Sequence, residues 1–238
     1  KLPGWRLFGE ALGESPDSKL VFVEMQKADP ELMQAVEGSG KETAALLMRR
    51  LVEVSRPRTT AGDPLTVGRT SAILFAAGDP RVPVTQVMAA YVHRMVSNSA
   101  VVATMNGNVG AADVMRKLLS RWLRRQRDTD PYVNLLVAMQ FDLKESLGFS
   151  LKVLGGGKRP GVALRMALLS LNRFGDSKHL SLLEPFFADS SVVKLASTAD
   201  GKRVRIQLRD LALATAITLR KQDHRKFGFP HVRFDSYG

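Results

Sequence analysis

The chain has 238 residues, contains no cysteine and carries a formal net charge of +12. Hydrophobic residues make up 45% of the sequence and charged residues 24%, which is typical of a folded globular protein and excludes a wholly disordered chain. The lack of cysteine excludes disulfide scaffolds, thiol catalysis and cysteine-based zinc sites. No apolar run approaches the roughly 18 residues that a transmembrane helix needs.

The first residues lack the pattern of a signal peptide. The sequence begins at Lys1 rather than Met, and Leu2-Pro3-Gly4-Trp5 does not have a charged segment followed by an apolar one. A start without Met indicates a processed chain or a piece of a longer one, so the sequence assigns no compartment.

Helical signals dominate the chain. Ser15-Pro16 and Asp29-Pro30 are typical helix starts, because proline at the first helical position has no N–H to leave unpaired. A loop rich in Pro, Thr and Gly over 57–63 is a candidate internal joint. Apolar periodicity predicts helices over 17–27, 41–56, 64–77, 84–97, 109–127, 130–154, 160–174, 177–188 and 208–219.

One segment near 192–206 has the pattern of strands. Val192-Val193 and Val204-Arg205-Ile206 flank Ala199-Asp200-Gly201, and Asp-Gly between β-branched residues predicts a short hairpin. Everything else is predicted as helices joined by short turns, which makes the expected fold class all-α. The last helix, 208–219, is apolar almost all round and is expected to be buried, including Leu213 and Ile217.

An alanine-rich helical pattern recurs in the last third of the chain. It runs through 162–171, which is followed by Phe174-Gly175-Asp176, and then through 180–189 and 208–214. The pattern resembles HEAT repeats, in which small residues let the second helix of each pair pack closely between its neighbours. The resemblance implies an α-α superhelix, with residues 1–238 forming a single HEAT-like α-solenoid domain.

Stretches over nearly the whole chain resemble an uncharacterised family of HEAT-like proteins from planctomycete bacteria. That family usually has glycine before and proline after the pair Gln222-Asp223, where this chain has Lys221 and His224. The family implies a fold and no established activity. The matching stretches are 20–25, 72–75, 79–83, 116–119 with Trp122, 182–185, 207–214, 222–223 and 227–229.

The sharpest charged feature lies within the predicted helix 109–127. Helical periodicity places its apolar residues on one half of the wheel and its cations on the other. Such a face suits an anionic partner, whether an acidic protein, a phosphate backbone or lipid headgroups. The alternative is a solvated face neutralised by acids of neighbouring helices such as Asp79, Asp142 or Glu145. The candidate binding residues, with no acid among them, are Arg116, Lys117, Arg121, Arg124, Arg125 and Arg127.

The C-terminal 38 residues are also basic, with nine cations against three acids. Phe227, Phe229, Phe234 and Tyr237 are interleaved with these cations. Aromatic side chains among cations can stack on unpaired bases. The favoured interpretation is that these aromatics pack back on the helices and cap the end of the repeat.

No catalytic or cofactor motif is present. The histidines lack the spacing of a helical metal site, and no His-Glu-x-x-His or Gly-x-Ser-x-Gly occurs. Gly155-Gly156-Gly157-Lys158 lacks both the first glycine and the Ser/Thr of a phosphate-binding loop, and is expected to be a turn between helices. The sequence therefore predicts no enzyme, no metal and no cofactor.

Three functions remain as hypotheses. The first is a non-catalytic helical-repeat scaffold or protein-interaction module with a basic C-terminal half, whose partner is a protein with an acidic surface. The alternative is a nucleic-acid-binding protein that contacts the phosphate backbone. The third is a HEAT-like DNA glycosylase, in which Asp113 and Trp122 among the arginines would imitate the composition of that site.

Overall fold

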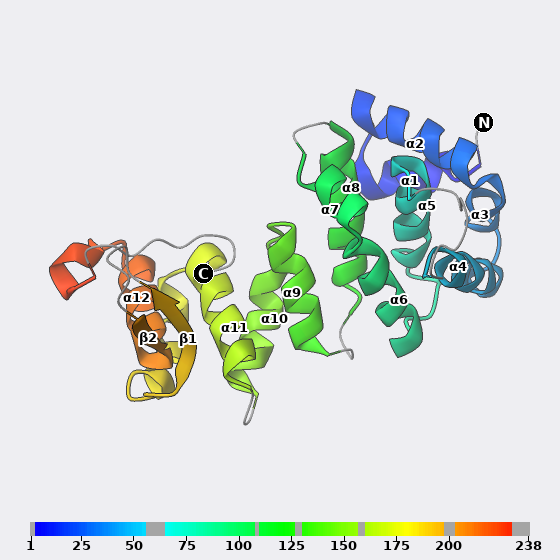
Figure 1. Cartoon of the computed structure of the whole chain (residues 1–238). Helices are drawn as coiled ribbons and strands as arrows, with labels where there is room; N and C mark the ends of the chain where they lie inside the picture. The colour runs from blue at the N-terminus through cyan, green and yellow to red at the C-terminus, as the bar shows by residue number, and fades with distance from the viewer. Residues whose placement is uncertain are drawn as a thin grey trace. The chain divides into compact units, whose positions relative to one another are not determined.

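The computed structural model describes residues 3–55, 65–107, 110–126, 130–156, 160–197 and 203–229 (Figure 1). In these ranges the chain forms α-helices, two 3-10 helices and one pair of strands, so the predicted all-α class is confirmed. The chain divides into two compact units, unit 1 over 1–129 and unit 2 over 130–238. The candidate joint at 57–63 lies outside the described residues, and the single solenoid domain stays a prediction.

The described residues of unit 1 form helices, and several of the helix starts carry capping residues that are visible in the sequence. Ser15 caps the first of the two Pro-initiated helices, and Thr66, Thr85 and Asn98 likewise accept a hydrogen bond from a backbone N–H in the first turn of the helix that follows. The helices are α1 (Trp5–Leu12), α2 (Pro16–Ala28), α3 (Pro30–Ala35), α4 (Gly40–Ser55), α5 (Val67–Ala77), α6 (Gln86–Val96), α7 (Ser99–Met105) and α8 (Gly110–Leu123).

The core of unit 1 forms around α5. This helix packs against α2, α4 and α8, and every residue from Thr70 to Ala77 is buried. Phe8, Phe22 and Phe75 gather on one side of it, with ring centroids 5.2 and 5.3 Å from Phe8. A helix that is apolar all round is typical of the centre of a domain, and α5 occupies that place.

Two glycines allow backbones to meet in unit 1. A Cβ added at Gly68 in α5 would lie 2.2 Å from the carbonyl oxygen of Glu24 in α2. A Cβ at Gly40, where α4 begins, would lie 2.2 Å from the carbonyl oxygen of Arg81. Both positions therefore require glycine for close approach rather than for conformational freedom.

Unit 2 consists of helices packed in chain order and one hairpin. α10 packs against both α9 and α11, α11 packs against α12, and η1 covers another side of α12. The strands are antiparallel, and Val192 pairs with Gln207 and Ser197 with Arg203, which confirms the hairpin. The elements are α9 (Pro131–Gln140), α10 (Glu145–Gly155), α11 (Gly161–Phe174), η1 (Ser177–Phe186), β1 (Val192–Ser197), β2 (Arg203–Gln207), α12 (Leu208–Leu219) and η2 (His224–Phe227).

Several helix predictions need correction. The stretch 130–154 is two helices, because Asp142 adopts the left-handed conformation (φ 56°), which breaks the ladder between α9 and α10. The segment 177–188 is the 3-10 helix η1, and α1 and α7 were not predicted as separate helices. In α12, Ile217 is buried as expected, but Leu213 is 40% exposed, so the prediction of burial all round is wrong.

No helix among the residues described here combines the length and apolar character needed to span a bilayer.

Candidate functional site

The apolar half of α8 is buried as the periodicity predicts. Trp122 is fully buried and packs edge-on against the ring of His93, with centroids 5.1 Å apart. Asp113 lies on the opposite, exposed side of the helix, so Asp113 and Trp122 do not share a surface site of the glycosylase type. The other buried residues of this half are Val114, Met115, Leu118, Leu119 and Leu123.

The six candidate cations do not stand in one continuous helical row. α8 ends at Leu123, so only the first three of them lie on the helix. Arg124 and Arg125 follow in a turn, where the N–H of Arg125 donates to the carbonyl of Trp122 at 3.0 Å. Arg127 lies outside the described residues.

The two cations nearest the start of α8 differ in their surroundings. Arg116 forms an ion pair with Asp113 one turn earlier, and it donates from Nη1 to the carbonyl of Met105 at 2.7 Å. The guanidinium hydrogen bond lowers the pKa of the exposed Asp113 carboxyl. Lys117 is exposed. Arg116 therefore serves the packing of α8 on the end of α7, while Lys117 remains at the surface.

Arg125 donates hydrogen bonds to backbone carbonyls at the end of α5 and in the loop that follows. Its Nη1 donates to the carbonyl of Ala77, the last residue of α5, at 2.6 Å. Its Nη2 donates to the carbonyl of Val82 and, at 3.5 Å, reaches that of Pro80. Carbonyls at a helix C-terminus lack partners within the helix and carry partial negative charge, so a cation there is stabilising. Burial lowers the pKa of Arg125, and the charge of Asp79 opposes that shift.

The side chain of Arg121 on α8 contacts α5. Its guanidinium carbon sits 5.9 Å from the centroid of the Phe75 ring, a cation–π contact. Its Nη1 is buried and has no hydrogen-bond partner among the described residues. Burial lowers the pKa of Arg121, Asp79 raises it and Arg124 lowers it further.

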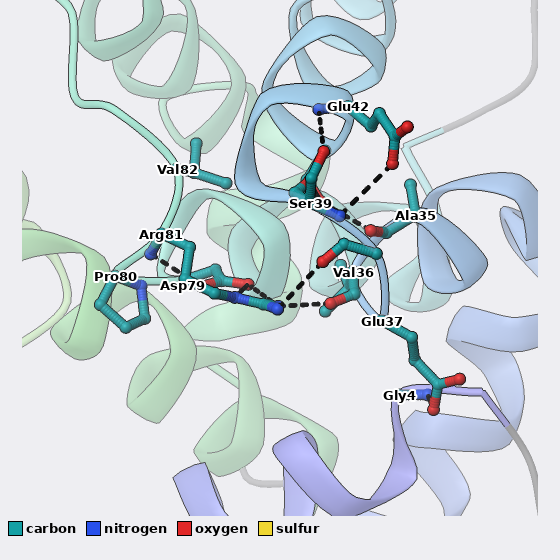
Figure 2. A network of polar contacts seen from close by, with 12 residues as sticks. Gly4, Ala35, Val36, Glu37, Ser39, Glu42, Asp79, Pro80, Arg81 and Val82 are labelled. Carbon is teal, nitrogen blue, oxygen red and sulfur yellow. Dashed lines mark hydrogen bonds and ion pairs between the residues drawn. The ribbon is translucent and has the colours of Figure 1, made fainter.

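Asp79 and Arg81 lie in the loop after α5 and are hydrogen-bonded to each other (Figure 2). Asp79 is only 5% exposed, and its carboxylate accepts hydrogen bonds from the backbone N–H of Arg81 at 2.9 Å and from its Nη2 at 2.6 Å. Arg81 also donates to the carbonyls of Val36 and, at 3.1 Å, of Gly38. Burial would raise the pKa of Asp79, but the Arg81 hydrogen bonds outweigh it and lower that pKa.

These residues form an arginine cluster, which we define as Arg81, Arg121 and Arg125 around Asp79. A cleft of about 290 Å³ opens beside it and is lined by residues of α1, α5, the loop after α5 and α8. Its charged lining residues are Glu10, Asp79, Arg81 and Arg121, and Phe75 lies beside them. The direct hydrogen bonds of Asp79 go to Arg81, while Arg121 and Arg125 interact with its charge without an ion pair. The predicted neutralisation by Asp79 is therefore partial.

Sequence reasoning missed Arg81 as a member of the site. Its position in the chain is 40 residues before Arg121, and no local pattern joins them. The available signal was the order Asp79-Pro80-Arg81 directly after an apolar helix, where a turn brings a cation beside the preceding acid.

Among the described residues, no group of three or more His, Asp or Glu side chains is placed to hold a metal ion. The sequence matches no protein-family model, and comparisons with curated proteins and with solved structures found no match.

Proposed function

We propose that the protein is a helical interaction module that binds an acidic surface of another protein through the arginine cluster of unit 1. The observation that carries the proposal is Arg121: its guanidinium is half-buried beside a cleft, and one of its donors has no acceptor among the described residues. A carboxylate bound in the cleft would lie beside this guanidinium and add a second negative charge to that of Asp79.

The charge balance of the cluster supports an anionic ligand. Three guanidinium groups surround Asp79, whose direct hydrogen bonds to the cluster go to Arg81. The other acid that lines the cleft, Glu10, is ion-paired with Arg6. A buried cation that lacks a counter-charge is costly, and an arginine paired with a carboxylate in bidentate geometry is among the stronger polar contacts in proteins. A partner acid bound at Arg121 would remove that cost.

We extend the proposal to the architecture and infer that the helices of unit 2 are HEAT-like repeats. Consecutive helices from α9 to α12 pack against one another, as the units of a solenoid do. Ala163, Ala167, Ala212 and Ala214 are buried, which fits the role of small residues at close helix contacts.

Binding to a phosphate backbone is the second candidate. It is supported by Lys117 and Arg124, which are exposed and would extend the positive surface beyond the cleft. A nucleic acid is expected to lose affinity steeply with salt because each phosphate contact releases counterions. A carboxylate held at one buried arginine is expected to be less sensitive to salt.

The test compares two probes on the full chain. A fluorescent polyglutamate peptide and a random-sequence DNA duplex are titrated at about 50 and about 200 mM salt. Arg121→Gln should weaken polyglutamate binding by roughly tenfold, because the charge and the fork of donors are both lost. The matched control is Arg94→Gln, which removes an exposed cation of unit 1 outside the cluster and should change affinity by less than about twofold.

Equal effects of the two variants would refute the role of the cluster. Tighter binding of the duplex than of polyglutamate, with the steep salt dependence, would favour the nucleic-acid function instead. Circular dichroism of each variant separates a loss of binding from a loss of folding.

A further inference from the structure

An apolar groove of about 430 Å³ lies in unit 2 and involves none of the arginine cluster. Leu213, Ala216 and Ile217 of α12 form its floor, and Phe187 after η1 and Phe227 of η2 stand at its walls. The sequence predicted that α12 is buried all round, whereas in the structure the side of α12 that carries Leu213 is open to this groove.

The large side chains around this groove are unusually exposed. Leu213 is 40% exposed, Phe187 37% and Phe227 51%. Single exposed apolar residues are ordinary, but a contiguous group of them on a concave surface is typical of a binding site for another molecule.

Four cations belong to the segment that lines the groove, and we call them the cationic rim: Arg220, Lys221, Arg225 and Lys226. Arg220 lines the groove itself, and the other three are next to or within two residues of the lining residues Gln222 and Phe227 in the chain. All four are exposed, and within the described part of the chain none of them forms an ion pair. Arg220 and Lys221 lie in the turn after α12, where Lys221 adopts the left-handed conformation (φ 55°) and the N–H of Gln222 donates to the carbonyl of Ile217 at 3.0 Å. Arg225 and Lys226 lie on η2.

Two acids lie near the rim and leave it positive. Glu184 is exposed and lines the groove. The Asp223 carboxylate accepts a hydrogen bond from the backbone N–H of Arg225 at 3.0 Å, so it caps the start of η2. Four cations against two acids give the rim a net positive charge.

We propose that the groove binds an amphipathic helix of a partner protein, with an apolar stripe flanked by acidic residues. The apolar stripe would bury the exposed Leu213 and Phe227, and the acidic flanks would face the cationic rim. Helices that lie in grooves use anchors at i, i+3, i+4 and i+7, which matches an apolar floor running along α12. The inference is independent of the arginine cluster, and either can fail without the other.

The shape of the site favours a helix over a membrane surface. A bilayer presents a flat apolar layer. The side chains here line a concavity formed by residues of η1, α12 and η2, and projecting side chains of a partner helix could enter it. The charge of the rim selects the flanking residues, because complementary charges across an interface set specificity and association rate more than total affinity.

The probe is a labelled peptide of about 16 residues with leucine at i, i+3, i+4 and i+7 and glutamate at most other positions. Its binding to the full chain is measured by fluorescence anisotropy. A second peptide keeps the leucines and replaces every glutamate by lysine. The glutamate peptide should bind at least about tenfold more tightly than the lysine peptide, since only its flanks oppose the rim in charge.

Two variants test the groove against matched controls. Leu213→Ala should weaken binding by about fivefold or more as an apolar anchor is lost, while Leu136→Ala, which truncates a leucine 37% exposed on α9, should leave it unchanged. Arg225→Glu with Lys226→Glu should abolish the preference for the glutamate peptide. Arg203→Glu with Arg205→Glu makes the same charge change on β2, away from the groove lining, and should preserve the preference.

Several outcomes would overturn the inference. Equal binding of the two peptides would refute acidic selection, and equal effects of Leu213→Ala and Leu136→Ala would refute the groove. A dimer in sedimentation that dissociates on Leu213→Ala would assign the groove to a second copy of the chain. Binding that is seen only after deletion of residues 230–238 would assign it to the protein's own C-terminal segment. Failure of the proposed function would be seen in a different measurement, the polyglutamate affinity of Arg121→Gln, and would leave the groove peptide results unchanged.

Discussion

At the residue scale, Asp79 and Arg81 connect two loops of unit 1, the loop after α5 and the loop before α4. The carboxylate accepts from the backbone and side chain of Arg81, and the same guanidinium donates to the carbonyls of Val36 and Gly38 in the loop before α4 (Figure 2). Charge-assisted hydrogen bonds of this kind are stronger than neutral ones, and a buried partner left alone is costly. The polar side chains of Asp79 and Arg81 therefore stabilise the contact between the loop after α5 and the loop before α4.

Asp79→Asn should lower the free energy of unfolding at pH 7 by on the order of 1–3 kcal/mol, because the charge-assisted bonds to Arg81 are weakened. The pKa of Asp79 is lowered in the folded chain, so its contribution is fully present above its unfolded pKa of about 4 and is lost as pH falls through the folded value. Urea unfolding at a series of pH values should show the wild type and the variant converging in acid. A constant difference down to about pH 2 would contradict the assignment.

The roles of the individual arginines were beyond the reach of the sequence. Periodicity correctly predicted the buried apolar side of α8, which includes Leu118 and Trp122. It could not show that Arg125 would donate to the carbonyls of Ala77 and Val82, since these lie at the end of α5 and in the following loop, more than 40 residues away in the chain. Arginines that are close together in the sequence, such as Arg121 and Arg125, therefore have different surroundings in the folded chain.

At the element scale, two close contacts between elements of unit 1 depend on glycines, which have no side chain. α2 and α5 meet where Gly68 faces the carbonyl of Glu24, and the first turn of α4 meets the loop after α5 at Gly40. Backbone atoms cannot move aside as the end of a flexible side chain can, so these contacts do not tolerate a methyl group.

Gly68→Ala should destabilise the protein by about 1–3 kcal/mol or more, because its Cβ would lie 2.2 Å from a backbone oxygen and the two helices must separate. Gly148→Ala is the matched control. It lies in α10, is exposed and has nothing within 4 Å of the added Cβ, so it should stabilise by roughly 0.5–1 kcal/mol. Chemical denaturation followed by circular dichroism measures both. The same sign for the two substitutions would refute the contact.

Elements with strong local signals were predicted well. The bounds of α12 follow from its apolar run between Gln207 and Arg220, and the hairpin follows from β-branched residues on both sides of Asp-Gly. The break at Asp142 was not predictable from periodicity, because the apolar spacing of α9 continues into α10 and the left-handed residue is an aspartate rather than a glycine. Lys221 shows the same effect after α12, where it makes a turn that commonly uses glycine.

At the scale of the whole molecule, positive charge is shared by both units. Unit 1 carries 18 basic and 13 acidic residues, and unit 2 carries 17 and 10. A division of the sequence at residue 100 assigns nearly the whole excess to the second part, but residues 101–129 belong to the first unit. Each unit therefore has its own basic surface, at the arginine cluster in unit 1 and at the cationic rim in unit 2.

Residues 1–129 and 130–238, expressed separately, should each fold and unfold cooperatively. The physical reason is that each has its own buried residues, such as Phe75 and Leu118 in unit 1 and Leu168 and Ala212 in unit 2, and each has the length of an ordinary domain. Circular dichroism and thermal unfolding of the two fragments measure this. Two unfolded fragments from a folded full chain would instead favour a single continuous solenoid, in which stability depends on the interface between neighbouring repeats.

The contact between Gly40 and the carbonyl of Arg81 bears on how evolutionary variation in this protein should be interpreted. Selection against any side chain at Gly40 acts through sterics alone and would operate whatever the protein binds. Invariance of that glycine among homologous chains would report the conservation of a fold, not of a function. Exposed positions that packing leaves free to vary, such as Lys117 and Phe227, are where sequence constancy would carry information about a partner.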